Sequence, residues 1–565
     1  MYLRTTKKKT SAGNVVESLQ IAESIWDPEK RRSVVNIIYN CGSTRDPNNT
    51  ERLRKLARGI LRRLSPEEIV VDNPDWKVVD AWPYGDLYVI EQLWERLGFK
   101  KRLPARIRDD TRRLLPVERA CFAMVANRCC APASKLYCFE QWLDKDVKIE
   151  GAEKLQLTHL YRSMDFFEKH KDEIEKDLYF HVADLFNVDV ELVFYDTTTL
   201  HCEIDEEDAD GEDGAVVHGS KLAGGKEYEA LRQRSRSSKN KRRDLPQIVV
   251  GLAMTRDGLP IRSWVFRGDK VDVQTVKKVK EDLRGWNLTR SVFVGDAGMV
   301  SQENLEALAK GGGKYIVCVP MGRGDEVTNY VLTSPGRYKK VSESLRVKEV
   351  VVGDGERRRR YVVCHNPHEE ERQRNHRKKV LSQLREMLPR LKCEHEDDKT
   401  HSKRVCQLRA SERFGKYLKY DDGRLQIDRD KVKRTERNDG KFVVHSNDDS
   451  LTPEDMALGY KQLLQVERAW RLLKSGIKIR PMFHWAPHRI CAHVSLTMVS
   501  FLIERVAENA CGDTWRNIRD DLRQIKLVQL LTPNGEVWQV TEAGPAALKR
   551  LKQLGIQPPP AVVHA

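Results

Sequence analysis

The stretch "LPQIVVGLAMTRDGLPIRSWVFRG", residues 245–268, decides the fold of this chain. Two apolar runs flank the sequence TRDG at 255–258, and Asp-Gly between apolar runs is typical of a tight turn between antiparallel strands. A further apolar run, "VELVFYDTTTLHCEI" at 190–204, precedes this hairpin in the chain. The three runs together predict an antiparallel meander of three strands.

The residues after the meander alternate between helix and strand patterns. Apolar residues recur with helical spacing in 271–286 and 301–310, whereas 291–299 and 314–320 contain short apolar runs. A meander followed by alternating helices and strands predicts a mixed α/β sheet covered by helices. This order of elements is that of a ribonuclease-H-like core, in which the first and fourth strands are neighbours.

The remaining segments flank this core and interrupt it once. Residues 15–41 predict a hairpin with one covered face around the turn DPEK, and 115–186 has helical spacing. A β-rich insertion is expected before the closing helices, with a hairpin at 347–365. The expected domains are an N-terminal mixed α/β unit (1–105), a helical DNA-binding or dimerisation unit (106–185), the first part of the core (186–330), the insertion (331–450), the closing core helices (451–512) and a C-terminal unit (513–565).

The charge balance favours a polyanionic partner. Lys and Arg number 100 against 84 Asp and Glu, which gives a formal net charge of +16 and a pI near 9.2. Such a balance is the electrostatic footprint of a nucleic-acid-binding protein, although a merely solvated cationic surface produces the same numbers. Composition alone leaves both interpretations open.

Cysteine usage and hydropathy indicate the compartment. The 12 cysteines are scattered without paired spacings, which predicts buried thiols in a reducing compartment. No stretch reaches 18 consecutive apolar residues, and no apolar segment follows the N-terminal "MYLRTTKKKT". We expect a cytoplasmic, nucleoid-associated protein with no membrane partner.

Two carboxylates occupy places where expected strands end. Asp196 follows the apolar Val193 and Phe194, and Asp296 follows the apolar run 292–294. An acid at the end of a buried strand is costly unless it is paired, hydrogen-bonded or bound to a metal. Because the first and fourth strands are neighbours in the expected sheet, Asp196 and Asp296 are expected to face one another.

A third carboxylate, Glu467, lies in the stretch "QVERAWRLLKSG", inside a single helix expected over 452–476. An ion pair with Arg471 four residues later is one interpretation of this acid. The other is that Glu467 joins Asp196 and Asp296 around divalent cations, since three converging carboxylates otherwise repel one another. Oxygen ligands without His or Cys favour magnesium, or manganese in its place.

These motifs together resemble a known family, the insertion-sequence DDE transposases of bacterial cut-and-paste elements. Within it the chain resembles the group whose third acid lies in a Y-x2-R-x3-E-x6-K signature. Tyr460, Glu467 and Lys474 have the signature spacing, whereas Leu463 occupies the Arg position. The motifs "FYDTTTLHCE", "FVGDAGMVSQEN", "GGGKYIV" and "DGKFVVHSND" also resemble the family, and the likeness extends over residues 186–505.

The resemblance implies a metal-dependent endonuclease and strand-transfer enzyme of DNA recombination and transposition. Asp196, Asp296 and Glu467 would be its catalytic residues and would hold two Mg²⁺ ions, with Mn²⁺ as a possible substitute. Cleavage at an element end would free a 3′ hydroxyl, which the same site would then join to target DNA. In the resembled group the excised ends pass through a DNA hairpin.

The resemblance also implies the DNA contacts and the assembly. Tyr460 and Lys474 would hold a phosphate near the hairpin bend, and Arg471 and Arg480 are expected as further DNA-binding residues. The partners would be double-stranded DNA, as the terminal inverted repeats of the element and as the target, and a second copy in a synaptic homodimer. Two other functions stay open: a catalytically silent DNA-binding repressor or architectural protein, and a ribonuclease-H-like nuclease for RNA or branched DNA.

Several further segments carry weaker expectations. The acidic loop 203–213 is expected to be solvated and mobile, and Trp470 and Trp485 are expected to pack against the sheet. The basic runs 357–360 and 377–379 could bind phosphates or form a solvated face. Two sets of residues have metal-binding side chains without the spacing of a zinc site, namely Cys393, His395, His401 and Cys406, and His484, His488 and His493.

Overall fold

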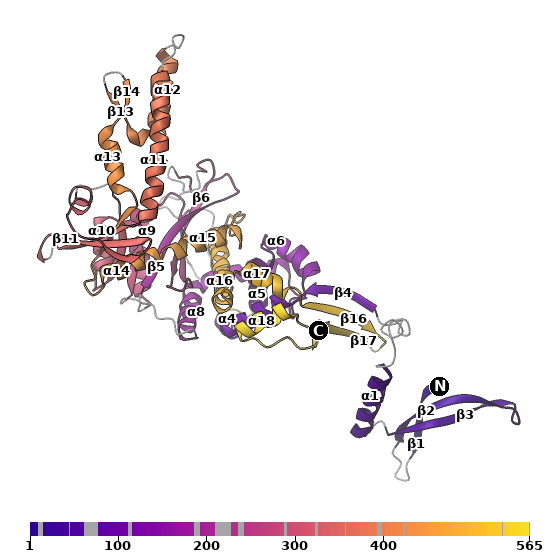
Figure 1. Cartoon of the computed structure of the whole chain (residues 1–565). Helices are drawn as coiled ribbons and strands as arrows, with labels where there is room; N and C mark the ends of the chain where they lie inside the picture. Colours follow the sequence, from indigo (N-terminus) through magenta and orange to yellow (C-terminus); the bar gives the residue numbers. More distant parts are fainter. Residues whose placement is uncertain are drawn as a thin grey trace. The chain divides into compact units, whose positions relative to one another are not determined.

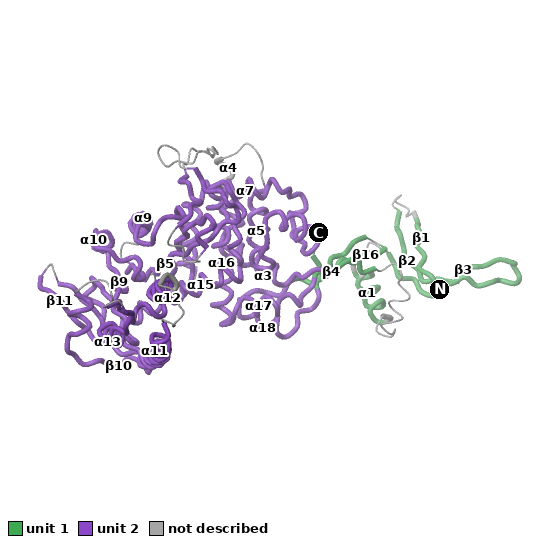
Figure 2. Tube along the Cα trace, turned by 90° about the horizontal axis from the view of Figure 1, so that it is seen from above, with its two compact units in different colours: residues 1–81, 527–540, 560–565 green, residues 82–526, 541–559 purple. Residues whose placement is uncertain are grey.

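A computed structural model describes most of the chain, in two compact units (Figure 1, Figure 2). Unit 1 comprises residues 1–81, 527–540 and 560–565, and unit 2 comprises 82–526 and 541–559. These units are coarser than the six segments expected from the sequence, which stay a prediction. The described residues are 1–9, 15–43, 46–61, 77–110, 116–185, 192–209, 228–235, 242–286, 291–321, 326–355, 358–391, 398–421, 424–533 and 535–563.

Unit 1 is built on two small sheets. The strands β2 and β3 form the hairpin predicted around the turn DPEK, which is therefore confirmed. Residues 32–40 of β3 are all exposed, so the expected covered face is not formed within the described part of this unit. The elements are β1 (Tyr2–Lys9), β2 (Val15–Asp27), β3 (Arg32–Ser43) and α1 (Pro47–Leu61), then β4 (Lys77–Pro83), β16 (Lys526–Thr532), β17 (Gly535–Val540) and β18 (Val562–Val563) in one sheet of order β18-β17-β16-β4.

Unit 2 contains a nine-stranded mixed sheet whose first five strands have the ribonuclease-H-like order. Three antiparallel strands are followed by two parallel ones, and the first strand pairs in parallel with the fourth. The predicted fold class is therefore confirmed. In the sheet order β7-β6-β5-β8-β9, these strands are β5 (Leu192–His201), β6 (Gln247–Met254), β7 (Pro260–Arg267), β8 (Val292–Gly295) and β9 (Lys314–Val319).

The two faces of this sheet pack against different helices. Phe194 and Leu200 of β5 belong to the apolar core shared with the closing helices, whereas Val193 and Tyr195 point to the opposite face. This alternation follows from the period of two residues in a strand. The helices on the first face are α14 (Pro453–Lys461), α15 (Leu464–Ser475) and α16 (Pro487–Cys511), and those on the second are α9 (Asp272–Arg284) and α10 (Gln302–Ala309).

A helical layer lies on the far side of α16, as predicted for residues 115–186. Among the described residues, α16 is long and apolar enough to span a membrane by length and composition, but 94% of its apolar window is buried inside the protein. The other elements are α3 (Gly85–Arg96), α4 (Phe99–Asp110), α5 (Val117–Cys130), α6 (Lys135–Tyr137), η1 (Cys138–Asp146), α7 (Leu157–Lys169), α8 (Lys171–Leu185), α17 (Trp515–Leu522) and α18 (Pro545–Leu554).

The insertion continues the core sheet instead of forming a separate one. Its strand β15 pairs with β9, and three more strands follow outward in the order β12, β11, β10. The predicted hairpin is confirmed as β11 and β12. The bounds are η2 (Ala297–Met299), η3 (Glu326–Val331), β10 (Lys339–Ser342), β11 (Leu345–Val352), β12 (Arg359–His365) and β15 (Lys441–Ser446).

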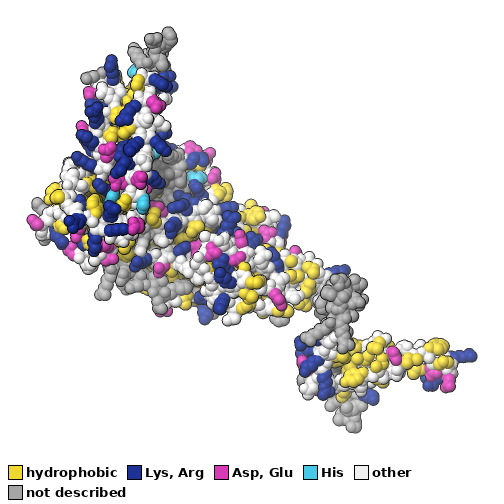
Figure 3. Space-filling view, in the orientation of Figure 1, with side chains coloured by type: hydrophobic (Ala, Val, Ile, Leu, Met, Phe, Trp, Pro, Cys, Tyr) yellow, Lys and Arg dark blue, Asp and Glu magenta, His cyan; other side chains and the backbone are white. Residues whose placement is uncertain are grey.

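Residues 366–440, here called the helical insert, connect the adjacent antiparallel strands β12 and β15. His365 pairs with Lys441 in the register, and the Asn366 amide donates to the Gly440 carbonyl at 2.7 Å. The helical insert has an apolar core of its own, and Figure 3 shows Lys and Arg side chains gathered over it. Its elements are α11 (Pro367–Met387), η5 (Leu388–Arg390), α12 (Asp398–Ala410), η6 (Gly415–Tyr417), β13 (Leu418–Asp421), β14 (Arg424–Ile427) and α13 (Arg429–Asn438).

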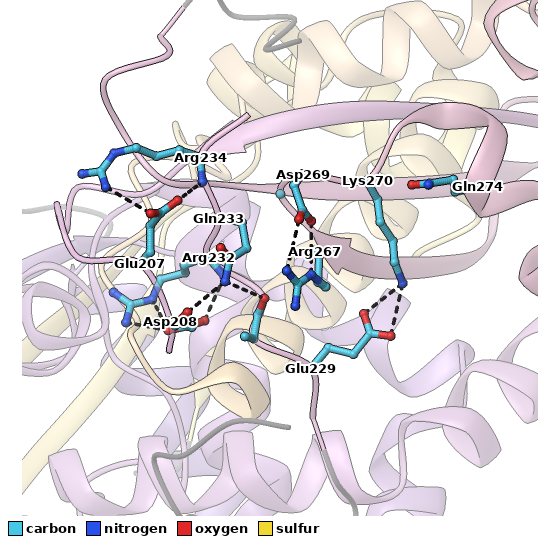
Figure 4. A network of polar contacts seen from close by, with 12 residues as sticks. Glu207, Asp208, Glu229, Arg232, Gln233, Arg234, Arg267, Asp269, Lys270 and Gln274 are labelled. Carbon is cyan, nitrogen blue, oxygen red and sulfur yellow. Dashed lines mark hydrogen bonds and ion pairs between the residues drawn. The ribbon is translucent and has the colours of Figure 1, made fainter. Parts of the chain in front are cut away.

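Most described residues of the acidic loop are exposed, as expected for a solvated segment, but Asp208 is buried, and Glu207 and Asp208 pair with arginines (Figure 4). Asp208 is 4% exposed and pairs with the equally buried Arg232, whose Nη2 lies 2.7 Å from Asp208 Oδ1. Arg234 pairs with Glu207 at 3.3 Å and donates to the Asp205 carbonyl. Arg232 and Arg234, more than 20 positions later in the sequence, therefore hold the part of the loop at 205–208. Residues 210–213 of the loop lie outside the described residues.

Candidate functional site

The structure places Asp196 and Asp296 on neighbouring parallel strands, as predicted. The register pairs Val193 with Phe293 and Phe194 with Val294, and continuing it by two positions sets Asp196 opposite Asp296. Asp196 is half-buried within β5, and Asp296 is exposed just after β8. Side chains two positions apart on a strand point to the same face, and Phe194 and Val294 face α14 and α15. The carboxylates of Asp196 and Asp296 therefore belong to that face of the sheet.

Tyr460 joins this pair through a direct hydrogen bond. Its hydroxyl donates to Asp296 Oδ1 at 2.9 Å, across 164 positions of sequence. Burial raises the pKa of Tyr460 well above its usual range, and Cys318 and Asp296 add to the shift. The phenol therefore stays protonated and keeps its proton for Asp296.

The helix expected over 452–476 is interrupted, which is a correction to the sequence analysis. Residues Gln462 and Leu463 form a turn between α14 and α15, so Glu467 lies in the first turn of α15 and not well inside one long helix. When the side-chain amide of Gln462 is oriented with its oxygen toward Arg256, that oxygen accepts hydrogen bonds from Arg256 Nε at 3.0 Å and Arg256 Nη2 at 3.2 Å. This contact with Arg256, in the turn between β6 and β7, stabilises the break at Gln462 and Leu463. Neither of these two positions is a glycine or a proline, so the sequence does not indicate the break.

Glu467 does not form the ion pair with Arg471 that local spacing suggested. Its carboxylate is exposed and has no hydrogen bond or ion pair with any described residue. Helix α15 packs on β5 through Val466, Ala469 and Leu473, so Glu467 projects from the flank of a helix that contacts the strand of Asp196. An acid in a first helical turn is also stabilised by the helix dipole.

Close packing holds α14 against the sheet next to Tyr460. A Cβ atom on Gly459 would lie 3.2 Å from Ile316 Cδ1 and 3.8 Å from Leu192 Cδ1. A side chain at position 459 would therefore crowd Ile316 of β9, whereas its distance from Leu192 of β5 is that of ordinary contact. The glycine thus allows the close approach that brings the Tyr460 hydroxyl to Asp296.

Sequence reasoning missed Asp272, at the first turn of α9. Thr197, the neighbour of Asp196, donates a short hydrogen bond from its hydroxyl to Asp272 Oδ1. A Cβ atom on Gly298 would lie 3.3 Å from Asp272 Oδ2, so the same carboxylate also lies beside the turn after Asp296. Asp272 therefore holds Thr197, next to Asp196, from the opposite face of the sheet, and lies close to the turn after Asp296. The signal in the sequence was Asp272 itself, the last residue of "GDKVD", at the start of the helix expected over 271–286.

The residues present fit a hard divalent cation in their chemistry. Asp196, Asp296 and Glu467 offer carboxylate oxygens only, which is the donor set of magnesium and manganese. Among the described residues, no group of three or more His, Cys, Asp or Glu side chains is close enough together to hold a metal ion. The elements that carry the three acids pack together, while the three carboxylates themselves are not gathered into one cluster.

The expected DNA-binding residues lie along one flank of this region. Lys474 is two helical turns after Glu467, and Arg471 is one turn after it, so the three share one side of α15. Arg471 is exposed and Lys474 is half-buried. Arg480 follows α15, and its charge helps lower the pKa of His201 at the end of β5, after the larger effect of burial.

Parts of the two basic runs have structural roles. Arg360 is 8% exposed and donates to the carbonyls of Asp448 and Leu451, and Arg377 is 4% exposed and pairs with Asp439. Lys378 and Lys379 are exposed. Arg357 lies outside the described residues.

The two sets of His and Cys residues without zinc-site spacing, and the two tryptophans, lie in different environments. His488 Nε2 lies 3.2 Å from Asp165 Oδ1, and His493 Nε2 lies 3.1 Å from the Ile479 carbonyl, so both histidines serve protein contacts. Trp470 is 5% exposed in the core as predicted, whereas the same prediction for Trp485 is wrong, since it is 57% exposed. Cys393 and His395 lie outside the described residues.

The strand order and the paired acids define a ribonuclease-H-like domain with a carboxylate site. Residues 213–485 match the family model described as "Transposase DDE domain". The matched segment includes Asp296, Tyr460 and Glu467, while Asp196 precedes it by 213 − 196 = 17 positions.

Two further comparisons complete the findings. No curated protein matches the chain. Among solved structures, the chain is similar to one described as "Cryo-EM structure of piggyBac transposase synaptic complex with hairpin DNA (SNHP)". The alignment has 10% sequence identity and a TM-score of 0.33, and it covers 78% of this chain and 79% of that one.

Proposed function

We propose that this chain is a DNA transposase that cleaves phosphodiester bonds at the ends of its own element and joins the freed 3′ hydroxyl groups to target DNA. The observation that carries the proposal is the pairing of Asp196 and Asp296 on adjacent parallel strands, with the Tyr460 hydroxyl on Asp296. The match of residues 213–485 to a transposase DDE domain supports the same reaction class.

The roles of the chain's own groups follow from their positions. Asp196, Asp296 and Glu467 would hold two magnesium ions, or manganese, which supply charge stabilisation at the scissile phosphate when bound. Within the described residues, the carboxylate of Glu467 has no hydrogen-bond or ion-pair partner, so it is available as a ligand. Tyr460 positions Asp296, and Asp272 holds Thr197, the neighbour of Asp196.

Basic groups beside the acids would bind the DNA. Lys474 and Arg471 share the flank of α15 with Glu467, and Arg480 follows at the end of the same region. The helical insert would add to the DNA-binding surface, because α11 and α13 carry exposed Lys and Arg side chains. The complete proposal includes terminal inverted repeats as substrates, hairpin ends as intermediates, a synaptic homodimer, and action in the cytoplasm.

An excision assay tests the proposal. A plasmid carries the gene with its native flanks, and loss of the segment is measured with magnesium present. Wild-type protein is expected to excise the segment, whereas Asp196→Asn, Asp296→Asn and Glu467→Gln abolish excision while remaining folded. Glu281→Gln is the matched control, because Glu281 is an exposed helical acid on α9, which covers the opposite face of the sheet.

Two outcomes would contradict the proposal. Undiminished excision by folded Glu467→Gln protein removes the third acid from the site. Absence of excision by a soluble wild-type protein that still shifts its flanking DNA in a gel favours a silent DNA-binding protein of the same descent.

A further inference from the structure

The helical insert contains a cavity that the proposed cleavage site does not use. Its volume is about 440 Å³, which is within the ordinary range of small-molecule sites. The first half of α11, the end of α13 and the turn η6 supply its walls, so the lining belongs to the helical insert alone. The lining includes Arg372, His376, Arg377, Lys416, Tyr417 and Asp439.

A buried tyrosine in the wall has a hydroxyl group that no protein group binds. Tyr417 is 2% exposed, and its ring belongs to the apolar core of the helical insert. Within the described residues, its hydroxyl has no hydrogen-bond partner, and the oxygen is not fully enclosed by protein. Since Tyr417 lines the cavity, the hydroxyl is accessible from there. A phenol that is held by the core in this way offers a fixed hydrogen bond to a ligand.

The acids of the cavity are already paired within the protein. Arg377 is 4% exposed and pairs with Asp439, which is 5% exposed. Gln373 accepts a hydrogen bond from the Gly440 amide at 2.9 Å and donates one to Glu369 Oε1 at 2.8 Å. These bonds join α11 to the end of α13. The walls are therefore fixed relative to one another, and neither Asp439 nor Glu369 contributes an unpaired negative charge.

Two basic side chains at the cavity have no acid partner. Lys416 and His376 are exposed, and within the described part of the chain neither forms a hydrogen bond or an ion pair with a carboxylate. The Lys416 Nζ lies 5.1 Å from the centroid of the Tyr417 ring, so the ammonium group and the free hydroxyl belong to the same wall. Arg372 is a third basic side chain, and it pairs with Glu369 at 2.7 Å. The cavity therefore has an excess of positive charge.

We propose that this cavity binds a phosphate group, carried either by DNA or by a free nucleotide. A phosphate offers strong acceptor oxygens and negative charge, and Tyr417, Lys416 and Arg372 supply donors and positive charge. An apolar or cationic ligand would leave these donors unbound. The phosphate site does not depend on the DNA cleavage proposed above, and only the DNA source of the phosphate rests on that function.

The charge around the cavity favours the same ligand. In residues 366–440, Lys and Arg exceed Asp and Glu by 21 − 15 = 6, and Figure 3 shows the basic side chains over the helical insert. Such a surface raises the local concentration of anions. A diffuse positive surface needs no cavity and no buried hydroxyl, so Tyr417 distinguishes a specific site from solvated charge.

The test measures heats of binding with the full-length protein and three probes: inorganic phosphate, adenosine monophosphate and adenosine. Wild type is expected to bind the two phosphate-bearing probes and not adenosine. Tyr417→Phe removes only the free hydroxyl and is expected to weaken adenosine monophosphate binding about tenfold. Because that hydroxyl has no partner among the described residues, the variant is expected to unfold at the same urea concentration as wild type.

Matched variants separate the cavity from the general charge of the helical insert. Tyr420→Phe makes the same change on an exposed tyrosine outside the cavity, and Lys433→Gln removes an exposed lysine of α13 outside it. Both are expected to bind adenosine monophosphate within about twofold of wild type, whereas Lys416→Gln is expected to weaken that binding about tenfold.

Competition by duplex DNA identifies the source of the phosphate. If the source is DNA, a duplex displaces adenosine monophosphate from wild type, and Tyr417→Phe weakens duplex binding in fluorescence anisotropy while Tyr420→Phe does not. If the source is a free nucleotide, the two ligands bind together and Tyr417→Phe leaves the affinity for the duplex unchanged. Either result supports the phosphate site.

Three results overturn the inference. The first is that wild type binds neither inorganic phosphate nor adenosine monophosphate. The second is that adenosine binds as tightly as adenosine monophosphate, because the cavity then does not recognise the phosphate. The third is equal binding by wild type, Tyr417→Phe and Lys416→Gln. Failure of the proposed function is separate, since a protein that binds adenosine monophosphate through Tyr417 but excises nothing keeps the phosphate site and loses the transposase reaction.

Discussion

Replacing Tyr460 by Phe tests whether its hydroxyl positions Asp296. The substitution removes one oxygen and retains the ring, which lies 5.5 Å from the Phe442 ring, centroid to centroid. A hydrogen bond to a charged group contributes about 1.5–3 kcal/mol. If that energy holds Asp296 in its reactive position, its loss slows strand cleavage by about 10- to 150-fold.

The assay is single-turnover cleavage of an end-labelled element terminus at saturating magnesium, followed by a magnesium titration. A positioning role predicts a higher half-saturating magnesium concentration as well as a lower rate. Tyr315→Phe makes the same chemical change on the other face of the sheet, where the Tyr315 hydroxyl contacts His445 Nε2 at 3.1 Å. It is expected to cleave within about twofold of wild type. The reasoning is refuted if folded Tyr460→Phe protein cleaves as fast as wild type, or if both variants are equally slow.

Three other predictions concern stability and DNA affinity. Asp208→Ala leaves Arg232 as an unpaired buried charge, so the free energy of unfolding measured in urea should fall by about 3–5 kcal/mol. The control Asp269→Ala removes a more exposed pair and should lower it by less than about 1 kcal/mol. Equal losses in the two variants would contradict this reasoning. Burial, together with the charge of Arg128, lowers the pKa of Lys135 from 10.5 to about 7 in the folded protein. Between pH 7 and pH 10.5, Lys135 is therefore protonated in the unfolded chain but largely neutral in the folded one. Wild-type stability from this group should therefore rise from pH 7 to about pH 10 in thermal melts, and Lys135→Met should lack that rise. Replacing the helical insert, 366–440, by Asn-Gly should leave a cooperative unfolding transition and weaken DNA binding measured by anisotropy; unchanged affinity would remove the insert from the DNA surface.

The core fold could be predicted because its signals are local. The strands at 190–204 and 245–268 and the helix at 271–286 each carry their own hydrophobic period, and the order of elements then fixes the sheet. Asp196 and Asp296 could be paired for the same reason, since adjacent parallel strands bring equivalent ends together.

The features that were not predicted depend on contacts between distant residues. The break at Gln462 is stabilised by Arg256 on another turn, and nothing in the helix sequence marks it. Arg377 looked like part of a surface charge run, yet its guanidinium is buried against Asp439, 62 positions later. Asp272 acts through a hydrogen bond with Thr197, and these two residues are 75 positions apart in the sequence. No local sequence pattern indicates such a contact.

The attachment of the helical insert has a consequence for how such a protein can be altered. Its chain enters and leaves the sheet at one point, where His365 pairs with Lys441. To the sheet, these 75 residues are equivalent to a hairpin turn, so an insert of another length or sequence can take their place without moving β9 or the acids beside it. The junction at 365 and 441 is therefore a natural grafting point, through which a different DNA-reading module could be attached to unchanged cleavage chemistry.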